Sequence, residues 1–229
     1  MSLPKIDSPV FRATLPSNGI EVKFRPFTVK EEKLLLMASE SNESKTTIDA
    51  VKQVMNNCLI DELDIDKIPT FDVEYLFIQL RSKSVDNMMA LRFVEEEIEH
   101  EVEINLDDIT ISRNEEHDNK IHLNDSVSII MKYPSFSMIE KMESTDQSDV
   151  VELISNSIDK IVNGEEVLEL KDYTKEEINA FIESFTSKNM RTIEKFFDTM
   201  PKMKIDVPYK SKDGEMKSKE VVGIQSFFT

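Results

Sequence analysis

The sequence predicts an α+β fold in which antiparallel β-hairpins pack with several amphipathic helices. Strand-forming stretches come in pairs around turn signals such as Asn18-Gly19 and Asp213-Gly214. Between these pairs, apolar residues recur at helical spacing behind helix-capping residues. Strands grouped into hairpins and separated by groups of helices are typical of the α+β class.

The first hairpin is expected over residues 10–26, with its turn at Asn18-Gly19. After the turn, Ile20, Val22 and Phe24 alternate with charged residues, which predicts a strand with one apolar face.

Three helices are expected to follow. Thr28 and Glu31 have the spacing of a capping box, so the first helix should begin at Thr28. A second helix is predicted from about Thr46 to Leu59. Pro69 precedes the third, TFDVEYLFIQLRSKS, at residues 70–84.

Residues 88–112 change to strand-like alternation and predict a second hairpin with an acidic tip at residues 95–97. The following segment, residues 112–125, is expected to continue the same sheet, with Ile121 and Leu123 pointing inward.

The second half of the chain is predicted to be mainly helical. Four helices are expected. The first begins after Tyr133-Pro134, and the second spans residues 146–162 and ends with a C-cap at Asn163-Gly164. The third begins at the Thr174/Glu177 capping box, and the fourth spans residues 187–200. A third hairpin closes the chain over residues 205–229. We place a domain boundary near residue 135, giving parts 1–135 and 136–229, with a single domain as the alternative.

Composition and charge limit the classes of function. The chain has 229 residues, of which 39% are hydrophobic and 32% charged, and its net charge is −17. Residues 202–229 hold six lysines and four acids, a local +2, so the rest carries −19. Such a background repels polyanions, so we expect no binding to nucleic acid. The chain lacks a run of roughly 20 apolar residues and a signal-peptide layout, so we expect no membrane contact and a cytoplasmic location.

Candidate catalytic and metal-binding residues are few. Cys58 is the only cysteine and lies on or beside an apolar helix face, which favours a buried structural thiol. His117 and His122, with neighbouring acids, come nearest to a metal cluster, but their spacing matches no metal site. Phosphate-binding glycine loops and nucleophile motifs are missing from the sequence. We therefore predict a protein that is not an enzyme and has no catalytic residue, cofactor or metal.

The sequence offers better candidates for residues that bind a partner protein than for catalytic or metal-binding residues. The chain has 12 methionines; the pair Met88-Met89 at a helix-to-strand junction either fills the core or offers an adaptable surface. Phe227 and Phe228 end an apolar segment that either pairs with the strand of Val207 and Tyr209 or docks a partner. We name Met88, Met89, Phe227 and Phe228 as speculative partner-binding residues.

Several stretches in collinear order carry a resemblance to one family: KFRPFTVKEEKLLLMA at residues 23–38, FDVEYLFIQLRSKSV at 71–85, EINLDDI at 103–109, MKYPSF at 131–136, the segment 173–209 and GIQSFF at 223–228. Together they resemble the baseplate hub proteins of T-even-type contractile-tailed bacteriophages. The resemblance implies a non-enzymatic protein that helps to form the central hub of the baseplate, either as a subunit or as an assembly chaperone. It also implies other tail and hub proteins as partners, and a place in the host cytoplasm during assembly or in the virion tail.

The resemblance also implies C-x-x-C pairs, as in small zinc knuckles, on hairpins like those at residues 93–102 and 209–219. Here these hairpins read FVEEEIEHEV and YKSKDGEMKSK, without cysteine. We therefore expect the hairpins without the metal, and the lysines of the second tip to be solvated. An acidic adaptor for a basic or helical client, outside any virion, remains the alternative function.

Overall fold

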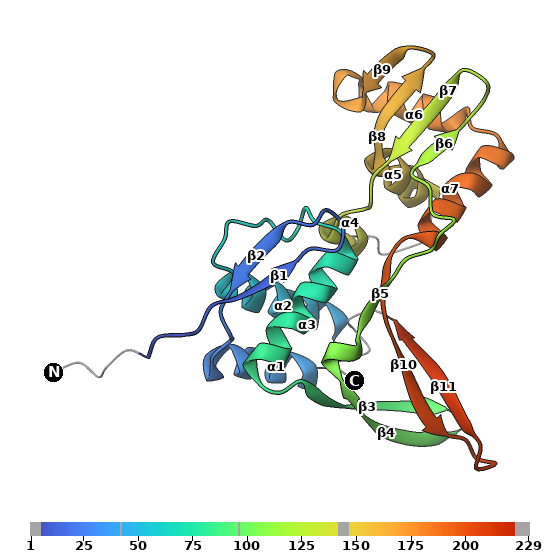
Figure 1. Cartoon of the computed structure of the whole chain (residues 1–229). Helices are drawn as coiled ribbons and strands as arrows, with labels where there is room; N and C mark the ends of the chain where they lie inside the picture. The colour runs from blue at the N-terminus through green and yellow to red at the C-terminus, as the bar shows by residue number, and fades with distance from the viewer. Residues whose placement is uncertain (1–5, 42, 96, 142–146, 223–229) are drawn as a thin grey trace. The chain divides into compact units, whose positions relative to one another are not determined.

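The computed structural model describes residues 6–41, 43–95, 97–141 and 147–222 (Figure 1). It confirms the α+β class, because helices alternate with small antiparallel sheets. Within the described part, no helix has the length and apolar character needed to cross a membrane.

The chain forms two compact units. Unit 1 contains Met1–Ile65, Phe71–Ser112 and Lys202–Thr229, and unit 2 contains Asp66–Thr70 and Arg113–Pro201. Unit 2 therefore comes from two segments of the chain, each of which interrupts the sequence of unit 1. The predicted division of the chain near residue 135 stays a prediction.

Unit 1 begins with the predicted first hairpin, made of β1 (Phe11–Thr14) and β2 (Glu21–Phe24). Gly19 has φ +74°, a conformation that glycine adopts without strain, at the turn between the strands. Val22 and Phe24 are buried as expected, but Ile20 is 56% exposed because it lies in the turn before β2.

The three predicted helices are α1 (Val29–Glu40), α2 (Ser44–Cys58) and α3 (Thr70–Ser84). The side chain of Glu31 accepts a hydrogen bond from the backbone N–H of Thr28 at 2.7 Å, as the capping box requires. Helix α3 is covered on several sides, so it forms the centre of unit 1; its buried apolar residues are Phe71, Val73, Leu76, Phe77, Ile78 and Leu80.

Two further hairpins complete unit 1. Strands β3 (Met88–Glu95) and β4 (Ile98–Asn105) form the predicted second hairpin. Strands β10 (Lys202–Lys210) and β11 (Met216–Val222) form the third, in a sheet of order β11-β10-β5 with β5 (Thr110–Ser112). Because Ser112 lies opposite Lys202, the chain leaves unit 1 and returns to it at neighbouring positions.

Unit 2 is a four-stranded antiparallel sheet with helices. The strands are β6 (Lys120–His122), β7 (Val127–Met131), β8 (Ile158–Asn163) and β9 (Glu166–Glu169), in that order across the sheet. The helices are α4 (Phe136–Lys141), α5 (Gln147–Ser157), α6 (Lys175–Glu183) and α7 (Ser187–Thr199). Sheet and helices share one core, formed by Ile121, Ile129, Met131, Ile154, Ile158, Ile182, Ile193 and Phe196.

Two predictions for this region are wrong. Residues 112–125 do not continue the sheet of the second hairpin: β6 begins a separate sheet by pairing with β7. The local cause is Asn124, whose side-chain oxygen accepts from the N–H groups of Ser126 and Val127, each at 2.9 Å. Such an Asx turn folds β7 back onto β6.

The helix predicted over residues 146–162 ends at Ser157, and residues 158–163 form β8. The β-branched residues Ile158, Ile161 and Val162 favour a strand once β7 offers an edge to pair with. Asn163-Gly164 is therefore a hairpin turn between β8 and β9 and not a helix C-cap, and Gly164 has φ +61°.

Candidate partner-binding site

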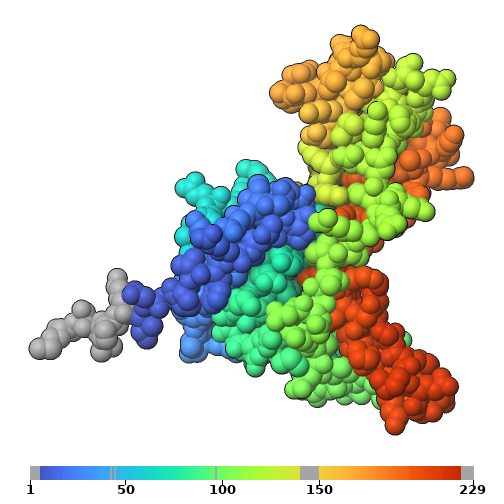
Figure 2. Space-filling model, viewed as in Figure 1, coloured from blue at the N-terminus to red at the C-terminus, as the bar shows by residue number. Residues whose placement is uncertain are grey.

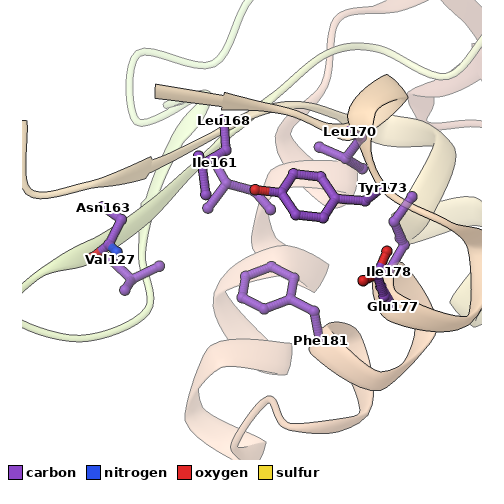
Figure 3. Close-up of a pocket in the computed structure, with 9 residues that line it drawn as sticks. All are labelled: Val127, Ile161, Asn163, Leu168, Leu170, Tyr173, Glu177, Ile178 and Phe181. Atoms are coloured by element: carbon purple, nitrogen blue, oxygen red, sulfur yellow. The ribbon is translucent and has the colours of Figure 1, made fainter. Parts of the chain in front are cut away.

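Unit 2 has an open apolar pocket of about 300 Å³ at one end of its core (Figure 3). Its strand side is formed by Val127, Ile161, Asn163 and Leu168. Ile161 and Leu168 lie directly opposite each other in the β8–β9 pairing, so both side chains project from the same face of the sheet. Strand alternation and register therefore build this wall.

The other wall comes from the segment that leads into α6. It is formed by Leu170, Tyr173, Glu177, Ile178 and Phe181. The capping box of Thr174 and Glu177 fixes where α6 begins, and Ile178 and Phe181 follow three residues apart on one face of the helix. Their inner sides pack against the core of unit 2, so the pocket floor continues that core.

Tyr173 gives the pocket an aromatic side chain with a polar tip. Its side chain extends over the pocket, with the hydroxyl toward the strand side in Figure 3. Tyr173 is 40% exposed, and its hydroxyl makes no hydrogen bond within the described part of the chain. Tyrosines of this kind are enriched at protein interfaces because they combine a large contact area with a hydrogen-bonding group.

Glu177 places a carboxylate at the pocket wall. Its Oε2 accepts hydrogen bonds from the backbone N–H of Thr174 at 2.8 Å and from its hydroxyl at 3.0 Å. These bonds lower the pKa of Glu177. Its Oε1 makes no hydrogen bond within the described residues and can accept one from a ligand.

Acidic residues dominate the chain segment around the pocket. Residues 165–177, EEVLELKDYTKEE, contain six acids and two lysines, a local charge of −4. Lys171 pairs with Glu169, and this ion pair lowers the pKa of Glu169. An apolar pocket with one carboxylate at its wall and acidic residues around it can bind a segment that carries an apolar side chain next to a basic one.

A second hollow of about 920 Å³ lies along α5 and α6 and shares Tyr173 and Ile178 with the first. Its lining is more polar and includes Glu152, Ser155 and Asn156. It therefore offers a less specific apolar surface than the pocket of Figure 3.

The four residues named from the sequence lie elsewhere. Met88 and Met89 begin β3 in unit 1, where Met88 is 43% exposed and Met89 is buried. Met89 thus contributes to the core of unit 1, while a role of either residue in binding a partner stays a prediction. Phe227 and Phe228 lie outside the described residues. Neither Met88 nor Met89 lines the pocket, and the one pocket residue that the sequence analysis named, Glu177, was named only as part of a helix capping box.

The two hairpins that the family resemblance links with zinc contact each other directly. The ring of Tyr209 lies edge-on to Phe93, with centroids 5.7 Å apart, and 4.9 Å from the ring of His100. Lys219 donates a hydrogen bond to Glu95 and lies 4.9 Å from the centre of the Phe93 ring. Figure 2 shows the second hairpin in green against the third in red. Lys219 is thus an exception to the expectation that these lysines are only solvated.

The remaining candidates have structural partners. The Nδ1 atom of His117 lies 2.9 Å from the Thr199 hydroxyl, and its ring stacks on Tyr133. Burial lowers the pKa of His117. Over the described ranges, no three metal-binding side chains come together. Cys58 is fully buried, and burial raises the pKa of its thiol to about 11, as expected for a structural residue.

Comparison with known proteins identifies one family. A family model described as T4 bacteriophage base plate protein matches residues 8–229. Neither the curated proteins nor the solved structures contain a significant match.

Proposed function

Because the chain belongs to the T4 bacteriophage base plate protein family, we propose that it helps to form the central hub of the phage tail baseplate. It acts through protein–protein contacts, either as a hub subunit that stays in the particle or as an assembly factor that leaves. Its partners are other tail and baseplate hub proteins, which it meets in the host cytoplasm. If it is a subunit, its final location is the baseplate of the virion.

The family match carries this proposal, because residues 8–229 include almost all of both units. The narrower assignment to the hub is supported by the stretches that resemble hub proteins, from residues 23–38 to 223–228. The pocket of unit 2 supports action by contact, since it combines tyrosine, apolar walls and a carboxylate.

A non-enzymatic role fits the chemistry of this pocket. Its titratable lining residues are Tyr173 and Glu177, and Glu177 is hydrogen-bonded to the helix cap. Nucleophilic or general acid–base catalysis needs a paired nucleophile and base, which this lining does not supply.

The experiment is a deletion of the gene in the phage, with complementation from a plasmid and mass spectrometry of purified particles. Failure to form hubs, rescued by the plasmid copy, is the expected result. Peptides of the chain in a fixed ratio to other hub proteins would identify a subunit, whereas their absence from infectious particles would identify an assembly factor. Normal baseplates formed without the gene would overturn the proposal.

A further inference from the structure

We infer that the pocket of unit 2 holds one large apolar side chain of another baseplate protein, in a segment where lysine or arginine flanks that side chain. The identity of the partner as a baseplate protein rests on the proposed function. The chemistry of the occupant rests on the pocket itself.

The size and lining of the pocket require an apolar occupant. A cavity of roughly 150 Å³ is enough to bind benzene, and this pocket measures about 300 Å³. It therefore has room for the side chain of leucine, methionine or phenylalanine. Covering the exposed parts of Leu168, Tyr173 and Phe181 removes apolar surface from water, which favours binding.

The carboxylate at the wall favours a hydrogen-bond donor beside that apolar group. Thr174 holds Oε2 of Glu177, so the direction of Oε1 is set before a partner arrives. A preset acceptor loses little conformational entropy on binding. A lysine or arginine next to the apolar residue would meet Oε1, and the Tyr173 hydroxyl provides a further hydrogen-bonding group.

The surrounding charge selects the same class of partner. Residues 165–177 carry six acids against two lysines, and the ion pair with Glu169 occupies one of these lysines, Lys171. The whole chain has net charge −17. An acidic segment would be repelled by this surface, whereas a basic segment is attracted and correctly oriented.

The direct test is methyl NMR on the full chain with three synthetic peptides. The probe is acetyl-Lys-Lys-Phe-Lys-Lys-amide, and the controls replace phenylalanine with alanine or all lysines with glutamate. We expect saturable shifts of the Ile161, Leu168 and Ile178 methyl signals with the probe. Binding should be at least about tenfold weaker with either control. Absence of saturable shifts, shifts confined to other methyl groups, or equal binding of the glutamate peptide would overturn the inference.

Paired variants test each wall. Leu168→Asp places a charge in the pocket, whereas Val167→Asp places the same charge on the opposite face of β9, where Val167 is 57% exposed. We expect Leu168→Asp to abolish saturable binding of the probe and Val167→Asp to preserve it. Equal effects in two folded variants would contradict the inference.

Glu177→Gln keeps the capping box, because glutamine also serves at this position. This variant tests the contribution of the Glu177 charge to binding, and it does so even if Leu168→Asp does not fold. We expect about two- to fivefold weaker probe binding and a smaller salt dependence. Glu176→Gln, the same change at an exposed position outside the pocket lining, should leave binding unchanged. Identical affinities for Glu177→Gln and wild type would contradict the role of the carboxylate.

The same spectra separate other outcomes. Shifts of the three methyl groups with protein concentration alone would show a second copy of the chain in the pocket and overturn the inference. If the gene proves essential for hub formation but the probe does not bind, only this inference fails. If the probe binds as expected but baseplates form without the gene, only the proposed function fails.

Discussion

The buried carboxylate of Glu31 shows how much one residue contributes to unit 1. Glu31 is only 5% exposed and accepts hydrogen bonds from the guanidinium of Arg25, the nearer at 2.7 Å, and from Thr28. The Arg25 bonds, and then those of Thr28, lower the pKa of Glu31 to about 2 from an ordinary 4.5. The ionised side chain of Glu31 therefore links the start of α1, at Thr28, to the segment after β2, at Arg25.

We predict a specific pH dependence of stability from this group. Because the pKa of Glu31 is lowered by folding, its contribution is complete above the ordinary pKa and disappears as pH falls from about 4.5 toward 2. Over this range, wild type should lose about 3 kcal/mol more unfolding free energy than Glu31→Gln, as measured by urea denaturation. The control Glu40→Gln, exposed at the other end of α1, should follow wild type. Parallel curves for Glu31→Gln and wild type would contradict the prediction.

Cys58 gives a second prediction at this scale. The thiol is fully buried and burial raises its pKa to about 11, so the native protein should hardly react with a thiol reagent at pH 8. We expect labelling at least about 10³-fold slower than in urea, with the onset of labelling at the unfolding transition seen by circular dichroism. Rapid labelling of the folded protein would be inconsistent with this burial.

Among the elements, those with local signals were predictable from sequence. The first hairpin follows from Asn18-Gly19, and α1 and α6 begin at their capping boxes. Residues 158–163 were not predictable, because their helical spacing continues that of α5 and only pairing with β7 makes them a strand. The pocket depends on the register of β8 and β9 against α6, which no local pattern encodes.

The turn between β8 and β9 can be tested by substitution. A Cβ at Gly164 would meet no atom within 4 Å, so its φ of +61° is the sole source of strain in an alanine variant. We expect Gly164→Ala to lower the unfolding free energy by about 1 kcal/mol. Gly164→Asn should cost less, because asparagine tolerates this conformation. Equal destabilisation by both variants in chemical denaturation would argue against a backbone origin.

Contact between the second and third hairpins leads to another prediction. Tyr209 is 7% exposed and touches Phe93 and His100 across the two hairpins. Tyr209→Ala should lower the unfolding free energy by about 3 kcal/mol, because it leaves a cavity in this ring cluster. Met216→Ala, on β11 at a position 70% exposed, should change it by no more than about 0.5 kcal/mol. Similar values for the two variants would mean that the hairpins do not stabilise each other.

For the whole molecule, charge is the dominant property. A net charge of −17 opposes binding to a polyanion, even though four lysines lie near the tip of the third hairpin. One of these, Lys219, is engaged with Glu95. The sequence-based expectation that this tip does not bind nucleic acid stays a prediction.

We predict no binding of a labelled 20-base-pair DNA duplex at about 0.15 M salt and up to about 100 μM protein. Fluorescence anisotropy should stay constant, while a polylysine peptide raises it in the same assay. An anisotropy increase that weakens with added salt would show that the lysine-rich tip binds phosphate groups.

The long segment of unit 2 between β5 and β10 has a consequence for synthesis on the ribosome. Strand β5 lacks its partner β10 until the whole segment Arg113–Pro201 has been translated. At about 5–20 residues per second, this delay lasts roughly 4 to 18 seconds. During that time the chain up to Ser112 must wait with an unfinished sheet. Strands β10 and β11 are translated after this segment and complete unit 1, whose first strands were translated at the start. A translation product that ends before β10 would therefore contain an incomplete unit 1.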